Sequence, residues 1–191
     1  TQFDQSVDKR SVHQKRQLVD KLTGAMYAGE LLRNVMAQLN IDRLLFDGRT
    51  CEGRLEEKDA ISPKFIIEVL NAKSRDESLN NVRRLCEEMG FKSSTSMDYE
   101  IIYEACVAIT NRSAGIVAAL ISALLKHLGS KRIKIGVGGA LIQFNPQYIE
   151  LLKEKLAILA PEDCDWALAE CEEGSGRGAG YVAAVVEKLG L

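Results

Sequence analysis

Residues 132–151, RIKIGVGGALIQFNPQYIEL, decide the fold class, because a strand pattern here interrupts a chain that is otherwise helical in period. Three apolar residues alternate with polar or small ones: Ile133, Ile135 and Val137. That spacing is the two-residue period of a half-buried strand. We expect the strand to turn at Gly138-Gly139 and to continue through residues 140–144, after which Asn145-Pro146 supplies a cap and a first-turn proline for a helix to about Leu159. The stretch predicts a strand–glycine–helix unit.

A second unit of the same kind follows. Residues 165–171 predict a strand with Trp166, Leu168 and Ala169 facing inward, and a glycine run at 174–178 precedes an amphipathic helix from 179 to 189. Because a helix connects the two strands, we expect them to be adjacent and parallel.

The chain before Lys131 predicts helices only. Their expected ranges are 14–39 with bends at Gly24 and Gly29, 64–71 after Ser62-Pro63, 76–89 before Gly90, and a long helix from Ser96 or Asp98 to His127 before Gly129. The polar residues 1–13 predict a mobile leader or a severed connection. The whole pattern indicates a helix-rich α/β fold.

Composition excludes few classes of protein. With 46% apolar residues and a net charge of −2, the 191-residue chain can bury a core and gives no electrostatic reason to expect nucleic acid or an anionic membrane. The longest apolar stretch, 116–125, is too short to span a bilayer, so we expect no membrane span. Five cysteines without a C-x-x-C pair, and no secretory leader, predict reduced thiols and a cytoplasmic protein.

The glycine runs alone have two readings. A strand followed by glycine and a helix brings backbone N–H groups close to a phosphate. However, GSGRG at 174–178 lacks G-x-x-x-x-G-K-S/T, and GAGYVA at 178–183 does not directly follow a strand, as a dinucleotide fingerprint requires. On the residues alone, a plain turn stays the simpler interpretation.

Four blocks, in order, resemble the hexokinase and glucokinase family. LVDKLTGAMYAGELLRN (18–34) is similar to F-E-K-M-x-S-G-x-Y-L-G-E-I/L-x-R, and ITNRSAGIVAALISAL (109–124) to V-x-x-R-A-A-x-x-x-A-x-x-A-A. IGVGGALIQFNPQYIELL (135–152) resembles V-G-V-D-G-S/T-L/V-Y-x-x-H/Y-P-x-F/Y, and ECEEGSGRGAGYVAAV (170–185) resembles E-D-G-S-G-x-G-A-A. The resemblance implies part of a hexokinase large domain of the actin-like ATPase, ribonuclease H-like, fold over 14–173. Residues 174–191 are then the interdomain connection and C-terminal helix.

The resemblance also assigns a site. Asp20 takes the place of the sugar-binding glutamate, one methylene shorter, although a solvated helix carboxylate is the plainer alternative. The nucleotide side falls on Gly24, Ala25, Met26, Gly138, Gly139, Ala140, Leu141, Gln143 and Phe144. Pro63 and Ile67 replace a threonine and a serine near ATP, Gly138 replaces an aspartate, and Gln143 replaces a lysine. We expect no catalytic and no metal-binding residue in this chain, and we expect Arg112 to be an ion-pair partner.

The implied parent reaction is phosphorylation of the 6-hydroxyl of glucose or a similar hexose by ATP with Mg²⁺. The general base and the glycine-rich phosphate hairpin of the family have no counterpart here, so they are expected on a missing N-terminal lobe, and this chain alone is expected to be inactive. Two alternatives stay open. One is a non-catalytic hexokinase-like regulatory or sugar- and nucleotide-binding protein, and the other is a small independent interaction domain.

Overall fold

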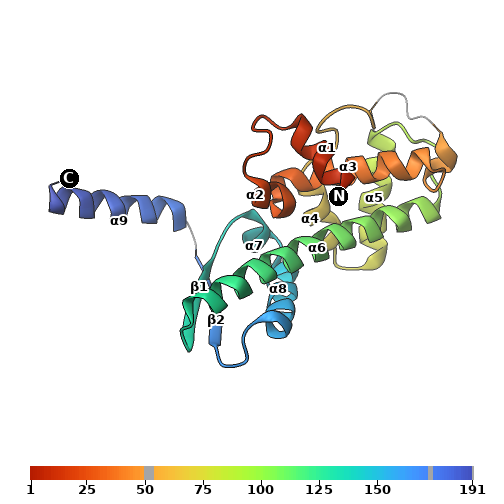
Figure 1. The fold of residues 1–191 in the computed structure, drawn as a ribbon. Coiled ribbons are helices and arrows are strands. Elements are labelled where there is room, and N and C mark those ends of the chain that lie inside the picture. Colours follow the sequence, from red (N-terminus) through yellow and green to blue (C-terminus); the bar gives the residue numbers. More distant parts are fainter. Residues whose placement is uncertain (50–53, 172–173, 191) are drawn as a thin grey trace.

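The computed structural model describes residues 1–49, 54–171 and 174–190, and Figure 1 shows a body of packed helices that carries a two-stranded sheet. The elements in chain order are α1 (Gln2–Arg10), α2 (Leu18–Thr23), α3 (Ala25–Ile41), η1 (Phe46–Gly48), α4 (Lys64–Leu70), α5 (Arg75–Glu88), α6 (Ser96–Leu128), β1 (Arg132–Val137), α7 (Ala140–Phe144), α8 (Pro146–Leu159), β2 (Asp165–Glu170) and α9 (Gly174–Leu189).

The long helix α6 runs through the whole body (Figure 1). Its 33 residues span about 50 Å at the usual helical rise. The hydroxyl of Thr95 accepts the Asp98 N–H and the Asp98 carboxylate accepts the Thr95 N–H, so the N-cap is Thr95 rather than the predicted Ser96 or Asp98. Gly129 ends the helix at φ +61°, a conformation that favours glycine, as predicted.

Two hydrophobic clusters lie along α6. The larger cluster joins the N-terminal half of α6 to α3, α4 and α5, and Phe46 stacks on Phe91 within it at 3.6 Å between ring centroids. The Phe46 N–H donates to the buried Asp98 carboxylate at 2.7 Å, which ties η1 to the start of α6. The smaller cluster joins the C-terminal half of α6 to α8 through Ala118, Leu152 and Leu156.

The sheet lies on the smaller cluster. β1 and β2 are parallel, in register from Arg132 opposite Asp165 to Val137 opposite Glu170, which confirms the predicted adjacency and direction. Trp166 and Leu168 pack against the α6–α8 cluster, as expected for inward-facing residues.

Three expectations from the sequence were wrong in local structure. The predicted mobile leader contains helix α1, which packs on α3 and buries Val7 to 3% exposure. Residues 140–144 form the short helix α7 instead of continuing the strand. The glycine run at 174–178 is the first turn of α9 rather than a loop before it, and α9 stands away from the body without a buried residue (Figure 1). The domain boundaries drawn from the sequence stay predictions.

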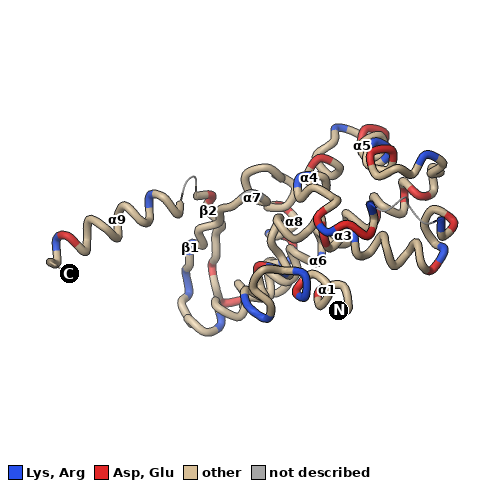
Figure 2. Tube along the Cα trace, turned by 90° about the horizontal axis from the view of Figure 1, so that it is seen from above, with Lys and Arg blue, Asp and Glu red and all other residues tan. Residues whose placement is uncertain are grey.

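The predicted ion pair is present, and the cysteines differ in their burial. Arg112 Nη2 pairs with Asp4 Oδ1 at 2.7 Å, which confirms the predicted ion pair and ties α1 to α6. Figure 2 shows basic and acidic residues interleaved, for example along α5. Cys86 and Cys106 are buried whereas Cys171 is exposed, and Cys51 lies outside the described residues. Burial raises the pKa of the Cys106 thiol far above its ordinary value, which is typical of an unreactive core cysteine.

Within the described residues, α6 is the one helix whose length and apolar composition would let it cross a membrane. Core helices pass the same test, and α6 contacts α2, α3, α4, α5 and α8 in the structure. The expected absence of a membrane span therefore stays a prediction.

Gly29 provides a test of the packing. A Cβ at Gly29 on α3 would lie 2.4 Å from the Ile61 carbonyl oxygen, and backbone cannot swing aside as a side chain can. We expect Gly29→Ala to lower the free energy of unfolding by about 1–3 kcal/mol, measured by urea denaturation. Gly115→Ala is the matched control, because its Cβ would meet only Lys155 Cδ at an ordinary 3.7 Å. Equal effects of the two substitutions would contradict the close approach at Gly29.

Candidate functional site

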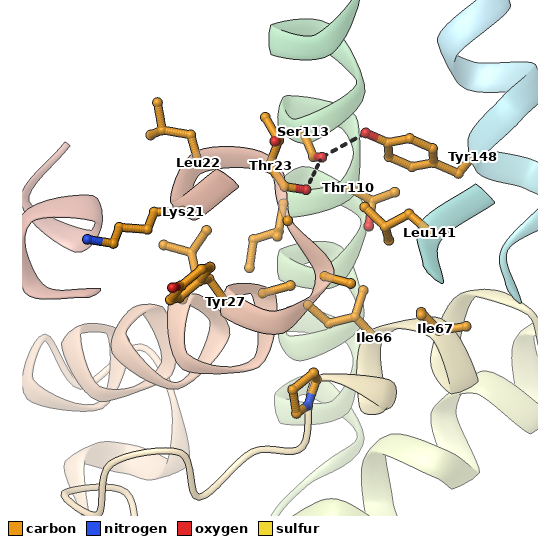
Figure 3. Close-up of a pocket in the computed structure, with 16 residues that line it drawn as sticks. Lys21, Leu22, Thr23, Tyr27, Ile66, Ile67, Thr110, Ser113, Leu141 and Tyr148 are labelled. Carbon is orange, nitrogen blue, oxygen red and sulfur yellow. Dashed lines mark hydrogen bonds between the residues drawn. The ribbon is translucent and has the colours of Figure 1, made fainter. Parts of the chain in front are cut away.

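A shallow hollow lies where α2, α3, α4, α6, α7 and α8 meet, and we call it the notch (Figure 3). Five positions that the family resemblance assigns to the nucleotide side or its neighbourhood line it: Gly24, Ala25, Pro63, Ile67 and Leu141. The fold therefore brings together positions that lie more than 100 residues apart in the sequence. The notch has a volume of only about 20 Å³.

The other nucleotide-side positions lie elsewhere. Gly138, Gly139 and Gln143 line a larger hollow of about 840 Å³, the glycine hollow, together with Cys171 and the first residues of α9. Leu141 faces the notch whereas Gln143 faces the glycine hollow, so α7 stands between the two. The resemblance assigns the glycine turn and residues 24–26 to one nucleotide side and so implies that they border one open cleft, but in the structure Gly24 and Ala25 line the notch whereas Gly138 and Gly139 line the glycine hollow, so this expectation is wrong.

Local sterics explain the glycines of this turn. A Cβ at Gly138 would lie 3.1 Å from the Cys171 carbonyl oxygen, so the aspartate of the family motif would crowd β2 here. Gly139 has φ +110°, which a residue with a side chain rarely adopts.

Met26 and Phe144 line neither hollow. Their side chains are 65% and 57% exposed, respectively, and Asn71 Nδ2 donates to the Phe144 carbonyl oxygen, which joins α7 to α4. The side chain of Ala140 lies outside what the structure describes.

Asp20 lies beside the notch, in the first turn of α2, and does not line it. Its side chain is exposed and its carboxylate makes no hydrogen bond or ion pair with the described part of the chain. Gly24 adjoins it closely: a Cβ there would lie 2.5 Å from Asp20 Oδ1, and the Gly24 N–H donates to the Asp20 carbonyl oxygen. Asp20 is therefore a carboxylate that is available to a ligand, at a fixed place next to the α2–α3 turn.

Lys21 is a wall residue that the sequence reading missed. It is the one charged side chain among the described residues that line the notch, and it is 6% exposed. Its Nζ donates to Asp8 Oδ1 at 2.6 Å and to the His13 carbonyl oxygen. The hydrogen bond from Lys21 lowers the pKa of the Asp8 carboxyl, together with the bonds from the Lys15 N–H. The positive charge of Lys21 is thus matched by Asp8 and points away from the notch (Figure 3).

Ser113 joins three elements at the edge of the notch (Figure 3). Its hydroxyl donates to the Thr23 carbonyl oxygen at 2.9 Å and lies 2.8 Å from the Tyr148 hydroxyl, which links α6 to the end of α2 and to α8. Burial raises the pKa of Tyr148, and the bond to Ser113 offsets part of that rise. The family segment quoted above has alanine where this chain has Ser113, and that departure was the available signal.

The lining of the notch does not fit Mg-ATP. Phosphate groups are held by cations, hydroxyls and backbone N–H groups, and Mg²⁺ by carboxylate oxygens and water. The side chains of Pro63, Ile67 and Leu141 supply none of these, and the hydroxyls of Ser113 and Tyr148 are already hydrogen-bonded within the wall. The described residues contain no cluster of three or more His, Cys, Asp or Glu side chains that could hold a metal ion.

Comparison with solved structures shows which fold the chain has. The structure of a hexokinase from Schistosoma mansoni complexed with glucose superposes with a TM-score of 0.86 at 30% identity, over 97% of this chain and 41% of that one. The architecture is thus that of the actin-like ATPase fold of hexokinases.

The sequence comparisons give the family. The hexokinase family profile matches residues 1–185. The human hexokinase HKDC1 is 33% identical over 99% of this chain and 21% of its own length, and a Brugia malayi hexokinase is 32% identical over 99% of this chain and 32% of its own length. The chain belongs to the hexokinase family and spans about a fifth to two fifths of the length of these relatives.

The bridge at Ser113 predicts an energetic coupling between α6 and α8. We expect Ser113→Ala and Tyr148→Phe each to lower the free energy of unfolding by about 0.5–1.5 kcal/mol, and the double variant to lose less than the sum, because both remove one shared hydrogen bond. Urea denaturation of the four proteins measures the coupling. Strict additivity would show that the two hydroxyls do not interact in solution.

Proposed function

We propose that this chain is the part of a cytoplasmic hexose-phosphorylating protein that carries one sugar-binding carboxylate. The observation that supports the proposal is the unpaired, exposed carboxylate of Asp20 beside the α2–α3 turn, at the position of the family's sugar-binding glutamate. A carboxylate accepts hydrogen bonds from two sugar hydroxyls at once, and these charge-assisted bonds are stronger than neutral ones. A hexose, glucose being the first to test, is the ligand that this chemistry and the family favour.

The parent reaction needs more than these residues. Transfer of a phosphoryl group to the 6-hydroxyl requires a base for the hydroxyl proton and cationic groups or Mg²⁺ for the phosphates. The described residues that line the notch offer one cation, Lys21, which Asp8 already pairs, and no carboxylate besides the neighbouring Asp20. We therefore propose that a further lobe supplies the base and the contacts to ATP and Mg²⁺, and that this chain alone orients the sugar without phosphorylating it.

A second candidate function is a non-catalytic, sugar-binding or regulatory member of the family. The apolar lining of the notch favours it, because Pro63 and Ile67 stand where the family places hydroxyls near ATP. A protein with this lining can keep the sugar contact of Asp20 while it lacks turnover.

The role of Asp20 is testable by sugar binding. We expect millimolar glucose to raise the thermal unfolding midpoint of the 191-residue chain, and Asp20→Asn to abolish the shift because a carboxamide oxygen is a weaker acceptor. Asp76→Asn, an exposed first-turn aspartate on α5, is the matched control and should keep the shift. A glucose shift of unchanged size in Asp20→Asn would contradict the assignment.

The same protein tests the absence of turnover. A coupled assay for glucose 6-phosphate with Mg-ATP and glucose should give no rate above buffer, because Asp20 is assigned to holding the sugar and no carboxylate or histidine is among the described residues that line the notch. Turnover that follows the chain through purification would show that the base lies within it.

A further inference from the structure

The notch, which is one of the two hollows lined by the assigned nucleotide-side positions, is too small for Mg-ATP. The notch holds about 20 Å³, which is room for roughly one water molecule. Pockets for drug-sized ligands hold several hundred cubic ångströms. Ile67 and Leu141 enter the notch from α4 and α7 and occupy space that a ligand would need (Figure 3).

Charge disagrees as well. Lys21 is held by Asp8 and by the His13 carbonyl oxygen, so it gives no free cation to the notch. Gln143, at the position of the family's lysine, is neutral and lies on the other side of α7. A triphosphate bound here would bring several negative charges to a lining whose one described cation, Lys21, is already paired with Asp8.

Hydrogen bonds also join the helices that line the notch to one another. Ser113 bridges the Thr23 carbonyl oxygen and the Tyr148 hydroxyl across the edge of the notch, and Tyr148 is 3% exposed. Widening the notch would break buried hydrogen bonds as well as apolar contacts, and both carry a cost.

We infer that the notch excludes nucleoside triphosphates through its own side chains, chiefly Pro63 and Ile67. The inference rests on the proposed placement of the nucleotide side. It goes beyond the proposed function, because it says that the lining of the notch itself prevents nucleotide binding there.

The experiment restores the two hydroxyl residues. Pro63→Thr/Ile67→Ser removes volume and adds hydroxyls, and threonine is also a good N-cap for α4. With about 5 mM Mg-ATP we expect a midpoint shift below about 1 °C for the unaltered chain and of roughly 3 °C or more for the double variant. Ile158→Ser, the same chemical change at an 81% exposed position on α8, is the matched control and should not respond.

Each outcome decides the inference. A shift in the unaltered chain overturns it, and so does the absence of a shift in a folded double variant, since the barrier would then lie outside these two side chains. If the double variant does not fold, Ile67→Thr keeps the β-branched shape and takes its place. The shift of the unfolding midpoint by glucose is measured in parallel. If glucose does not shift the midpoint of the unaltered chain, this counts against the proposed function alone. The Mg-ATP result tests the notch.

Discussion

The packing of one long helix against two separate clusters is the constraint on which the rest of the structure depends. The N-terminal half of α6 packs in the larger cluster with α3, α4 and α5. Its C-terminal half packs in the smaller cluster with α8 and the sheet. The capping box at Thr95 and the left-handed Gly129 fix where this helix begins and ends. Both clusters share this one helix, and the Asn71–Phe144 and Ser113–Tyr148 hydrogen bonds add further links between the two sides.

The notch follows from that arrangement. It lies near the middle of α6, where Thr110 and Ser113 face the end of α2 on one side and Tyr148 of α8 on the other. Residues assigned to sugar and nucleotide by family resemblance therefore reach a common region without being neighbours in sequence. Because the same helices meet at the notch, apolar side chains from α4 and α7 fill it. The chain therefore keeps the architecture of the family while the residues that line the notch differ from the family pattern.

Much of the fold was predictable because the local signals are strong. The alternation at Ile133, Ile135 and Val137, the Asn145-Pro146 cap and the glycines at 90 and 129 each act through a single residue's backbone preference or a simple period. Helix α1 was missed although it has a local signal, the Thr1–Asp4 capping box; its packing on α3 and the Asp4–Arg112 ion pair depend on residues far away in the sequence. The helical state of the 174–178 glycines was likewise not predictable from glycine's low helix propensity.

The site was predictable only in part. Sequence resemblance brought Gly24, Pro63, Ile67 and Leu141 to one place, and the structure agrees. It did not show that Leu141 and Gln143 face different hollows. The sequence was expected to continue as a strand here, whereas the helix α7 turns Leu141 toward the notch and Gln143 toward the glycine hollow. Nor did it show the Lys21–Asp8 pair or the Ser113 bridge, which depend on residues far apart in the sequence.

A crystal structure of the 191-residue chain grown with Mg-ATP and glucose would test the central claim most directly. We expect Ile67 and Leu141 to keep their places in the notch, with the Ser113–Tyr148 hydrogen bond intact and no nucleotide density between the α2–α3 turn and α7. Density for adenosine in the notch, with its phosphates directed toward residues 24–26, would contradict the claim that this chain's own side chains exclude it.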